Sequence, residues 1–244
     1  MPISTRKSEV VDSACCHART NCADCKVRLL SVCAALESDE LCELEKLAHK
    51  AMFESKETLF SQELQADSVY NVTEGVVRLY KLLPDGRRQI VGFALPGDFL
   101  GLAMDDHYGF SADAIGHVTA CRFSRADFSK LIDEKPHLLR RLHEFSTHEL
   151  RLAQDQMVLL GRRTAEEKVA SFLNSLRQRW ARLHGSSVTV PLPMSRQDIA
   201  DFLGLTIETV SRTLSQFVRN KIILVVPGGV RLTDTARLEA LAEA

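Results

Sequence analysis

The spacing of hydrophobic residues changes along the chain, and each change marks a different kind of element. Leu41, Leu44 and Leu47 recur at helical spacing behind Ser38, a residue type that caps helices, which predicts a short amphipathic helix over 38–51. From about 58 to 128, short apolar or alternating runs are separated by turn residues such as TEG, LPDGR and LPGD. Several short strands at this spacing predict an antiparallel roll or barrel rather than a parallel sheet.

A helix without internal Gly or Pro is predicted over Pro136–Leu160, and it carries two heptad stripes. A helix that only packs on the roll needs one stripe, so two stripes predict contact with its own domain and with a second copy. The first stripe is Leu138, Leu142, Phe145, Glu149, Leu152, Gln156 and Leu159, and the second stripe is Leu139, His143, Ser146, Leu150, Ala153, Met157 and Leu160.

The last third begins with an amphipathic helix that starts at Thr164 and ends near Gly185, followed by an edge strand over 187–194. In residues 195–219, Ser195 and Asp198 have capping-box spacing before a short apolar helix. Gly204 then permits a sharp turn into a second helix, which Thr206 caps. This pattern predicts a helix-turn-helix.

The second helix of this pair has an apolar face formed by Ile207, Val210, Leu214 and Phe217. Its opposite face is equipped for reading bases, since Arg can grip guanine through two bonds and Glu can accept from the cytosine amino group. We expect Glu208, Ser211 and Arg212 to contact bases and Arg196, Thr206 and Arg219 to contact the DNA backbone. A hairpin over 222–232 makes the unit a winged helix-turn-helix.

Composition and charge limit the class of protein and the partners that the chain can have. The 244 residues, 45% of them hydrophobic, suit one large domain or two modest ones and exclude a mostly disordered chain. No run approaches the ~18 apolar residues of a membrane span, and no apolar leader follows the N-terminus, so we expect a cytoplasmic protein without membrane partners. Because the net charge is −1, contact with double-stranded DNA requires a local basic face.

Seven cysteines in an apparently cytosolic chain point to reactive or metal-binding thiolates rather than disulfides. Most of them lie in residues 1–35, a polar segment without a sustained apolar period, which needs help such as a metal centre to fold. Cys22, Cys25, Cys33 and the distant Cys121 supply four thiolates. This number suits an iron–sulfur cluster or structural zinc, and spacing alone does not separate the two.

The roll, the long helix and the segment LPMSRQDIADFLGLTIETVSRTLSQFVR resemble the FNR–CRP family of bacterial transcription regulators over essentially the whole chain. In that family the E-x-x-S-R motif, here Glu208, Ser211 and Arg212, reads a TTGAT half-site. The branch that binds cyclic AMP carries Arg where this chain has Ile207, and it has an Arg-Ser pair where this chain has Phe110-Ser111. An anionic phosphate lacks a charged partner there, so no cyclic nucleotide is expected.

The oxygen-sensing FNR branch holds a [4Fe–4S] cluster with three N-terminal cysteines and a fourth in the roll, and VTACRFSRADF around Cys121 resembles that setting. The C-x2-C-x7-C spacing is similar to the alphaproteobacterial variant. The resemblance implies that Cys22, Cys25, Cys33 and Cys121 hold the cluster. It further implies that the cluster forms without oxygen and promotes homodimer formation and binding to a TTGAT-type palindrome, activating or repressing genes of anaerobic or microaerobic metabolism.

The resemblance also implies an RNA polymerase contact at Asp85, Gly86 and Arg87, although such a turn is as readily a plain solvated hairpin. Nitric oxide, a haem or a Cys15-Cys16 thiol switch are alternative signals, and Cys15 or Cys16 could replace an N-terminal ligand. A zinc-stabilised DNA-binding protein without a sensing role is a further alternative. A thiol–disulfide enzyme using Cys22-x-x-Cys25 lacks its βαβ setting, so we expect no enzyme.

The expected architecture is therefore α+β, in four parts. A cysteine-rich cluster-binding segment (1–35) precedes an antiparallel β-roll sensor domain (36–133) of the cupin-like, cyclic-nucleotide-binding type. A dimerisation helix (134–163) then leads to the winged helix-turn-helix domain (164–244).

Overall fold

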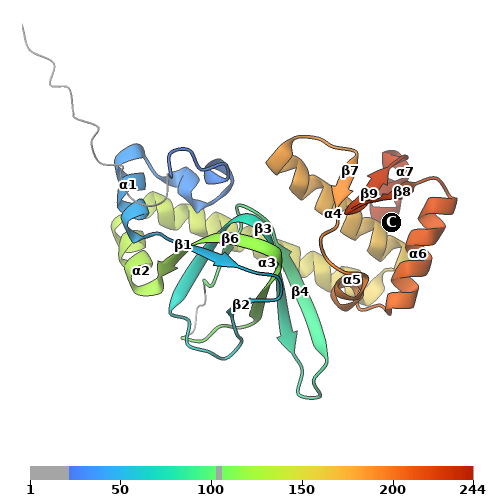
Figure 1. The fold of residues 1–244 in the computed structure, drawn as a ribbon, viewed down its shortest axis with the longest axis horizontal. Coiled ribbons are helices and arrows are strands. Elements are labelled where there is room, and N and C mark those ends of the chain that lie inside the picture. Colours follow the sequence, from blue (N-terminus) through green and yellow to red (C-terminus); the bar gives the residue numbers. More distant parts are fainter. Residues whose placement is uncertain (1–21, 103–105, 244) are drawn as a thin grey trace, which may run out of the picture.

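A computed structural model describes residues 22–102 and 106–243 of the chain. A β-roll lies at one end, a winged helix-turn-helix unit lies at the other, and one long helix runs between them (Figure 1). The expected α+β fold class is confirmed. Among the described residues, no helix is both long and apolar enough to cross a membrane.

The N-terminal cysteine segment forms two 3-10 turns, η1 (Arg28–Leu30) and η2 (Val32–Ala35), before helix α1 (Ser38–Leu47). Val32 and Leu36 are buried in one core with apolar residues of α1, β6, α2 and α3. Two details of the predicted helix over 38–51 are wrong. Glu37, not Ser38, occupies the cap position, where its backbone N–H donates to the Glu40 carboxylate, and residues 49–53 form a strand because they pair with β6.

Six strands make the roll: β1 (His49–Phe53), β2 (Thr58–Phe60), β3 (Ser68–Leu82), β4 (Arg88–Ala94), β5 (Phe99–Leu100) and β6 (Ser111–Ser124). Their pairing is antiparallel throughout, with β6 and β3 side by side at the centre of the order β1-β6-β3-β4. The antiparallel roll is thus confirmed, but the expected turn at TEG is wrong. The β3 strand runs through it with register shifts on both sides of Glu74, and Gly75 has φ +83°.

Glycine is required at position 75, because a Cβ there would lie 2.2 Å from the carbonyl oxygen of His117. Sequence spacing alone does not distinguish such a bulge from a turn, since both favour glycine with positive φ.

Two helices follow the roll, α2 (Arg125–Glu134) and the long α3 (Pro136–Arg162). The predicted long helix is confirmed, and its two stripes have different surroundings. In the first stripe, Leu138 and Leu142 are buried and Phe145 and Leu159 pack against the protein cores. In the second stripe, Leu139, Leu150 and Met157 are exposed by 55%, 59% and 64%. Among the described residues, the first stripe thus makes most of the apolar contacts of α3 with its own chain, whereas three large apolar residues of the second stripe remain exposed.

The C-terminal unit contains α4 (Ala165–His184), α5 (Arg196–Leu203), α6 (Ile207–Arg219) and α7 (Thr235–Glu243). Strands β7 (Thr189–Pro191), β8 (Ile223–Val226) and β9 (Gly229–Leu232) form a sheet in the order β7-β9-β8. The capping boxes at Thr164 and Ser195 are both present, and Gly204 is left-handed with φ 61°. The winged helix-turn-helix is confirmed, whereas α7, which packs on α4, was not predicted.

Candidate functional site

The cysteine segment is folded over the strand that carries Cys121. On β6, Cys121 lies opposite Lys50 of β1 on one side and Asn71 of β3 on the other. The Asn71 side chain donates through Nδ2 to Sγ of Cys33 at 3.9 Å. Because Asn71 is buried and adjoins both cysteines, it ties the end of the segment to the roll at the position of Cys121.

Cys22 and Cys33 lie in one apolar core against which Cys121 packs, and Cys25 is joined to Cys22 by the Cys-x-x-Cys turn. The pKa of the Cys121 thiol is raised to about 12, mainly by burial and in smaller part by the neighbouring Cys22, Cys25 and Cys33. Burial also raises the pKa of Cys33, against a hydrogen bond with Ser31 that lowers it. The four cysteines named from the sequence are therefore neighbours in the fold. In the described part of the chain, no three His, Cys, Asp or Glu side chains are already arranged to hold a metal ion.

Local hydrogen bonds shape the cysteine segment. The Cys25 backbone N–H donates to the Cys22 carbonyl at 3.4 Å, which closes the Cys-x-x-Cys turn, and the Arg28 N–H donates to the Cys25 carbonyl at 3.1 Å. The Ser31 hydroxyl accepts from the Cys33 N–H at 3.2 Å and caps η2. Since short polar residues rather than a large core set this conformation, the segment has little stability of its own.

The remaining three cysteines are not part of this group in the described structure. Cys42 lies half-buried on α1. Cys15 and Cys16, proposed above as a switch or as substitute ligands, lie outside the described residues.

The second helix of the helix-turn-helix, α6, exposes most of the face expected to read bases. Glu208 and Arg212 are exposed and Ser211 is half-buried, whereas Val210, Leu214 and Phe217 are buried. Backbone N–H donation at the helix start, with help from Thr206, lowers the pKa of Glu208. Glu208 is thus ionised at neutral pH and can only accept hydrogen bonds.

Ile207 is an exception to the predicted apolar face. It is 37% exposed, because it is the first residue of α6 and lies beyond the part of the helix that packs on the domain core.

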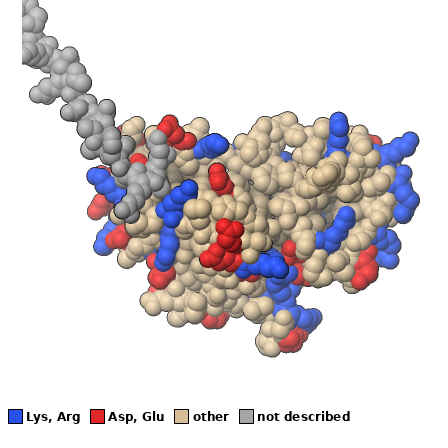
Figure 2. Space-filling model, viewed as in Figure 1, with Lys and Arg blue, Asp and Glu red and all other residues tan. Residues whose placement is uncertain are grey.

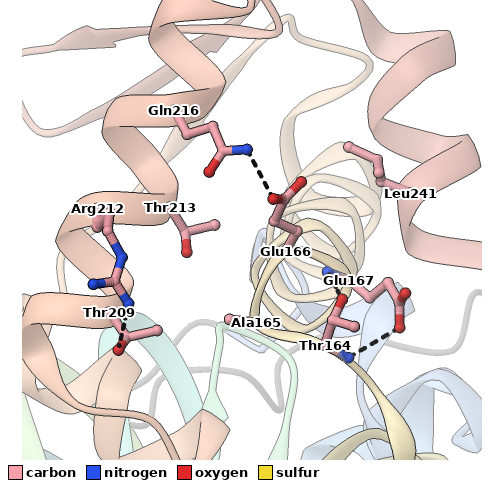
Figure 3. A pocket seen from close by; sticks show the side chains of 9 residues that line it. All are labelled: Thr164, Ala165, Glu166, Glu167, Thr209, Arg212, Thr213, Gln216 and Leu241. Carbon is pink, nitrogen blue, oxygen red and sulfur yellow. Dashed lines mark hydrogen bonds between the residues drawn. The ribbon is translucent and has the colours of Figure 1, made fainter.

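A hollow of about 460 Å³ lies where α6 passes the start of α4 (Figure 3). Gln216 of α6 donates through Nε2 to Oε1 of Glu166 on α4 at 2.8 Å, and Arg212 donates through Nη2 to the hydroxyl of Thr209 at 3.4 Å. Gln216 therefore fixes α6 against α4, while Arg212 is held only by a side chain of its own helix and remains available to a ligand.

The residues expected to contact the DNA backbone have different surroundings. Arg219 and Thr206 are exposed, and Figure 2 shows basic side chains along the edge of the molecule where α6 lies. Arg196 is half-buried, with Nη1 buried and without a hydrogen-bond partner. Arg163, a further basic residue of this unit, is turned inward, since it donates to the Ser171 hydroxyl at 2.7 Å and to the Ala242 carbonyl.

The turn between β3 and β4 forms the protruding hairpin tip at the bottom of Figure 1. Gly86 has φ +82°, and Asp85 accepts from the Arg87 backbone N–H at 3.0 Å and from its Nε at 2.7 Å. The predicted hairpin is confirmed. The Arg87 side chain is 77% exposed, and the polymerase contact at Asp85, Gly86 and Arg87 stays a prediction.

Comparison with known proteins matches two family models to this chain. A cyclic nucleotide-binding domain matches residues 50–135, and a Crp-like helix-turn-helix domain matches residues 167–241. The solved structure of FixK2 from Bradyrhizobium japonicum has 39% identity and a TM-score of 0.75, over 81% of this chain and 98% of that one.

Transcription regulators of known function are similar to this chain over most of its length. The nitrogen fixation regulation protein FixK of Bradyrhizobium diazoefficiens is 59% identical over 91% of this chain and 94% of its own length. The transcriptional activator protein FnrL of Cereibacter sphaeroides is 37% identical over 89% and 90%. The chain is therefore not an enzyme but a DNA-binding transcription activator, and it belongs to the Crp/FNR family of transcription regulators.

Proposed function

We propose that this regulator responds to oxygen through a [4Fe–4S] cluster held by Cys22, Cys25, Cys33 and Cys121. Without oxygen the protein pairs, binds a TTGAT-type palindrome and activates or represses genes of anaerobic or microaerobic metabolism. The observation that supports this most directly is that Cys22, Cys33 and Cys121 belong to one core at the end of the roll, where Asn71 of β3 donates to Cys33 and pairs with Cys121.

The donor set of four cysteines suits an iron–sulfur group, and ligation would have to draw the thiols closer together than they lie in the structure. Such clusters are held by four thiolates, and hydrogen bonds to the sulfurs and burial tune their potential. Here Cys33 is buried, Cys121 is half-buried, and the Asn71 amide donates to one of the sulfurs. When bound, the cluster would supply an oxygen-sensitive centre whose loss returns the four cysteines to free thiols.

Ligation would order the segment that carries three of the ligands. Residues 22–36 contribute Cys22, Val32, Cys33 and Leu36 to a core that also contains Leu138 and Leu142 of α3. Metal binding to a segment with little core of its own becomes folding free energy. The cysteine segment would then brace the N-terminal half of α3.

Bracing α3 affects the second stripe, which carries exposed Leu139, Leu150 and Met157 but is interrupted by His143 and Ser146. Regulators of this family act as dimers. Polar residues in a helix seam weaken pairing, so the seam of α3 would be marginal unless the docked segment supports it. Pairing places two reading helices in successive major grooves, ~34 Å apart.

Base reading would fall to α6. The Arg212 guanidinium can donate two hydrogen bonds to guanine, the ionised Glu208 can accept from a cytosine amino group, and Ser211 lies between them. The DNA phosphates would be held by Thr206, Arg219 and Arg196. The exposed hairpin would contact RNA polymerase through Asp85, Gly86 and Arg87.

We infer that the roll does not serve as a cyclic-nucleotide sensor, although its family model bears that name. Phe110, at the position where the resemblance puts an arginine, packs against Phe60 with ring centroids 5.8 Å apart. Phe60 in turn stacks on Tyr108 at 4.2 Å. An aromatic side chain offers no charge to an anionic phosphate.

The test is iron and sulfide content, visible spectrum and palindrome binding of anaerobically prepared protein, before and after air. The proposal expects about four iron and four sulfide per chain, the number the named cluster contains, with brown colour and tight binding that air removes together. Colourless protein that contains zinc and binds DNA equally in air would refute oxygen sensing. If nitric oxide but not oxygen removes the colour and the palindrome binding, nitric oxide would replace oxygen as the proposed signal.

A further inference from the structure

Two aspartates of the helix-turn-helix are bound by two arginines of the roll. On α5, Asp198 Oδ1 accepts from Arg78 Nη1 of β3 at 2.8 Å and from Arg88 Nη2 of β4 at 3.0 Å. Arg88 Nη2 also donates to Asp201 Oδ2 at 2.8 Å. The Asp198 and Arg78 side chains are only 7% and 14% exposed, so water competes little for these charges.

Residues of the roll also contact both arginines. Arg78 Nη2 pairs with Asp113 of β6 at 3.0 Å, and Tyr80 donates to the same carboxylate at 3.3 Å. The guanidinium carbons of Arg78 and Arg88 lie 5.7 and 5.8 Å from the centroid of the Tyr80 ring. Such preorganised charges favour one geometry of the partner.

Apolar contacts lie beside the ion pairs. Phe93 of β4 meets Phe202 of α5 and Phe172 of α4, with ring centroids 5.5 and 6.1 Å apart. Arg179 of α4 provides a second polar attachment, since it donates to the Phe93 carbonyl at 2.8 Å and pairs with Asp98. The DNA-binding unit is thus attached to the roll through both α4 and α5.

The covalent connection leaves the orientation open. Only Arg163 and Thr164 join α3 to α4, and a two-residue joint can rotate. The noncovalent contacts must therefore fix the direction of α6. In Figure 1, α5 faces the roll while α6 lies at the outer edge of the unit, and Glu208 and Arg212 are exposed.

We propose that Arg78 and Arg88 are positioning residues for DNA binding. By holding Asp198 and Asp201 they fix the orientation of each helix-turn-helix on its roll, and in the dimer this sets the separation at which the two α6 helices reach half-sites. The inference rests on dimeric DNA binding and does not depend on the cluster.

The experiment selects binding sites from a pool of random duplexes with the full-length, anaerobically prepared protein. The variants are Arg88→Gln and Asp201→Asn, which each remove one partner of the Arg88–Asp201 pair. Both leave intact the Asp198 Oδ2 bonds to Ser195 that cap α5. Lys130→Gln is the matched control, because Lys130 is 75% exposed and pairs with Asp127 on the surface of α2. Each selection reports two quantities, the half-site bases and the number of base pairs between half-sites.

Wild type and Lys130→Gln should recover half-sites at one spacing. Arg88→Gln and Asp201→Asn should recover the same half-site bases over several spacings and bind the wild-type palindrome about tenfold more weakly. The exchange Arg88→Asp with Asp201→Arg should restore the single spacing. If the half-sites are not TTGAT, the proposed site fails while the spacing result still tests the positioning role.

Three outcomes would overturn the inference. One is an unchanged single spacing in both variants. Another is an equal loss of affinity at every spacing together with a lowered melting temperature, which would show a merely structural role. The third is tighter binding by the variants, which would show that the contact restrains the protein instead of preparing it.

Discussion

The Asn71 side chain donates to the sulfur of Cys33 and stands beside Cys121 on the neighbouring strand. One buried amide thus links an N-terminal cysteine to the cysteine of the roll. The Asn71 side-chain oxygen Oδ1 is buried without a hydrogen-bond partner in the described structure. The polar contact of this side chain is therefore made by its Nδ2 donor. Hydrogen bonds of this kind stabilise sulfur ligands in the thiolate form.

Replacement of Asn71 should therefore weaken a cluster without removing a ligand. We expect Asn71→Ala to assemble the chromophore anaerobically but to lose it faster in air than wild type. The check is the rate of absorbance loss after mixing with air-saturated buffer. Thr73→Ala, on the same strand and bonded only to the Thr119 carbonyl, is the control. Equal rates in all three proteins would exclude a role for Asn71 at the sulfurs.

Arg212→Ala should cost ~1–3 kcal/mol per half-site, because it removes a two-bond contact to guanine. Glu208→Ala should relax the choice of the paired cytosine. Titration of a TTGAT palindrome and a scrambled duplex measures both, with Ser215→Ala as control, since Ser215 is bonded to the Ser211 carbonyl of its own helix. The reading helix is misassigned if both variants distinguish the two duplexes as wild type does.

Because the second stripe of α3 carries the most exposed apolar residues, we expect it to meet the partner and Ser146→Leu to strengthen pairing. Air should shift wild type from dimer toward monomer and weaken palindrome binding far more than half-site binding, whereas Ser146→Leu should partly retain both. Glu149→Leu lies in the first stripe and should therefore lose dimer and palindrome binding in air as wild type does. Sedimentation of matched anaerobic and aerated samples is the measurement. The same dimer with the same affinity in both samples would rule out control through association.

Acid should loosen the attachment between roll and helix-turn-helix. Burial alone would raise the pKa of Asp198, but hydrogen bonds from Ser195 and Arg78 outweigh it and lower the pKa. A lowered folded-state pKa gives stability that is fully present above the unfolded value near 3.8 and is lost as pH falls through the folded value. Denaturant midpoints of wild type should thus fall more steeply below about pH 4 than those of Asp198→Asn. Parallel curves would contradict this.

The helix-turn-helix could be predicted from the sequence almost to the residue, because caps and turns are local. Ser195 with Asp198, Gly204 and Thr206 do in the fold what their residue types favour. The prediction that Cys121 joins the N-terminal cysteines came from the family resemblance. The spacing of cysteines within the segment says nothing about a strand almost ninety residues away.

The interface between roll and helix-turn-helix was not foreseen. Arg78, Arg88 and Asp201 look like solvated charges in alternating or helical patterns, and only the tertiary arrangement makes partners of them. Asp198 was recognised as a cap but not as an ion-pair partner. Likewise, nothing local in the sequence indicates that α7 returns beside Arg163.

Cysteine replacement tests the central claim most directly. Iron and sulfide content, visible spectrum and palindrome binding should be measured on anaerobically purified Cys121→Ala and Cys42→Ala. The account predicts that Cys121→Ala loses the brown chromophore and anaerobic DNA binding, as single replacements of Cys22, Cys25 or Cys33 would, whereas Cys42→Ala, Cys15→Ala and Cys16→Ala keep both. Full iron occupancy and anaerobic DNA binding in Cys121→Ala would contradict it.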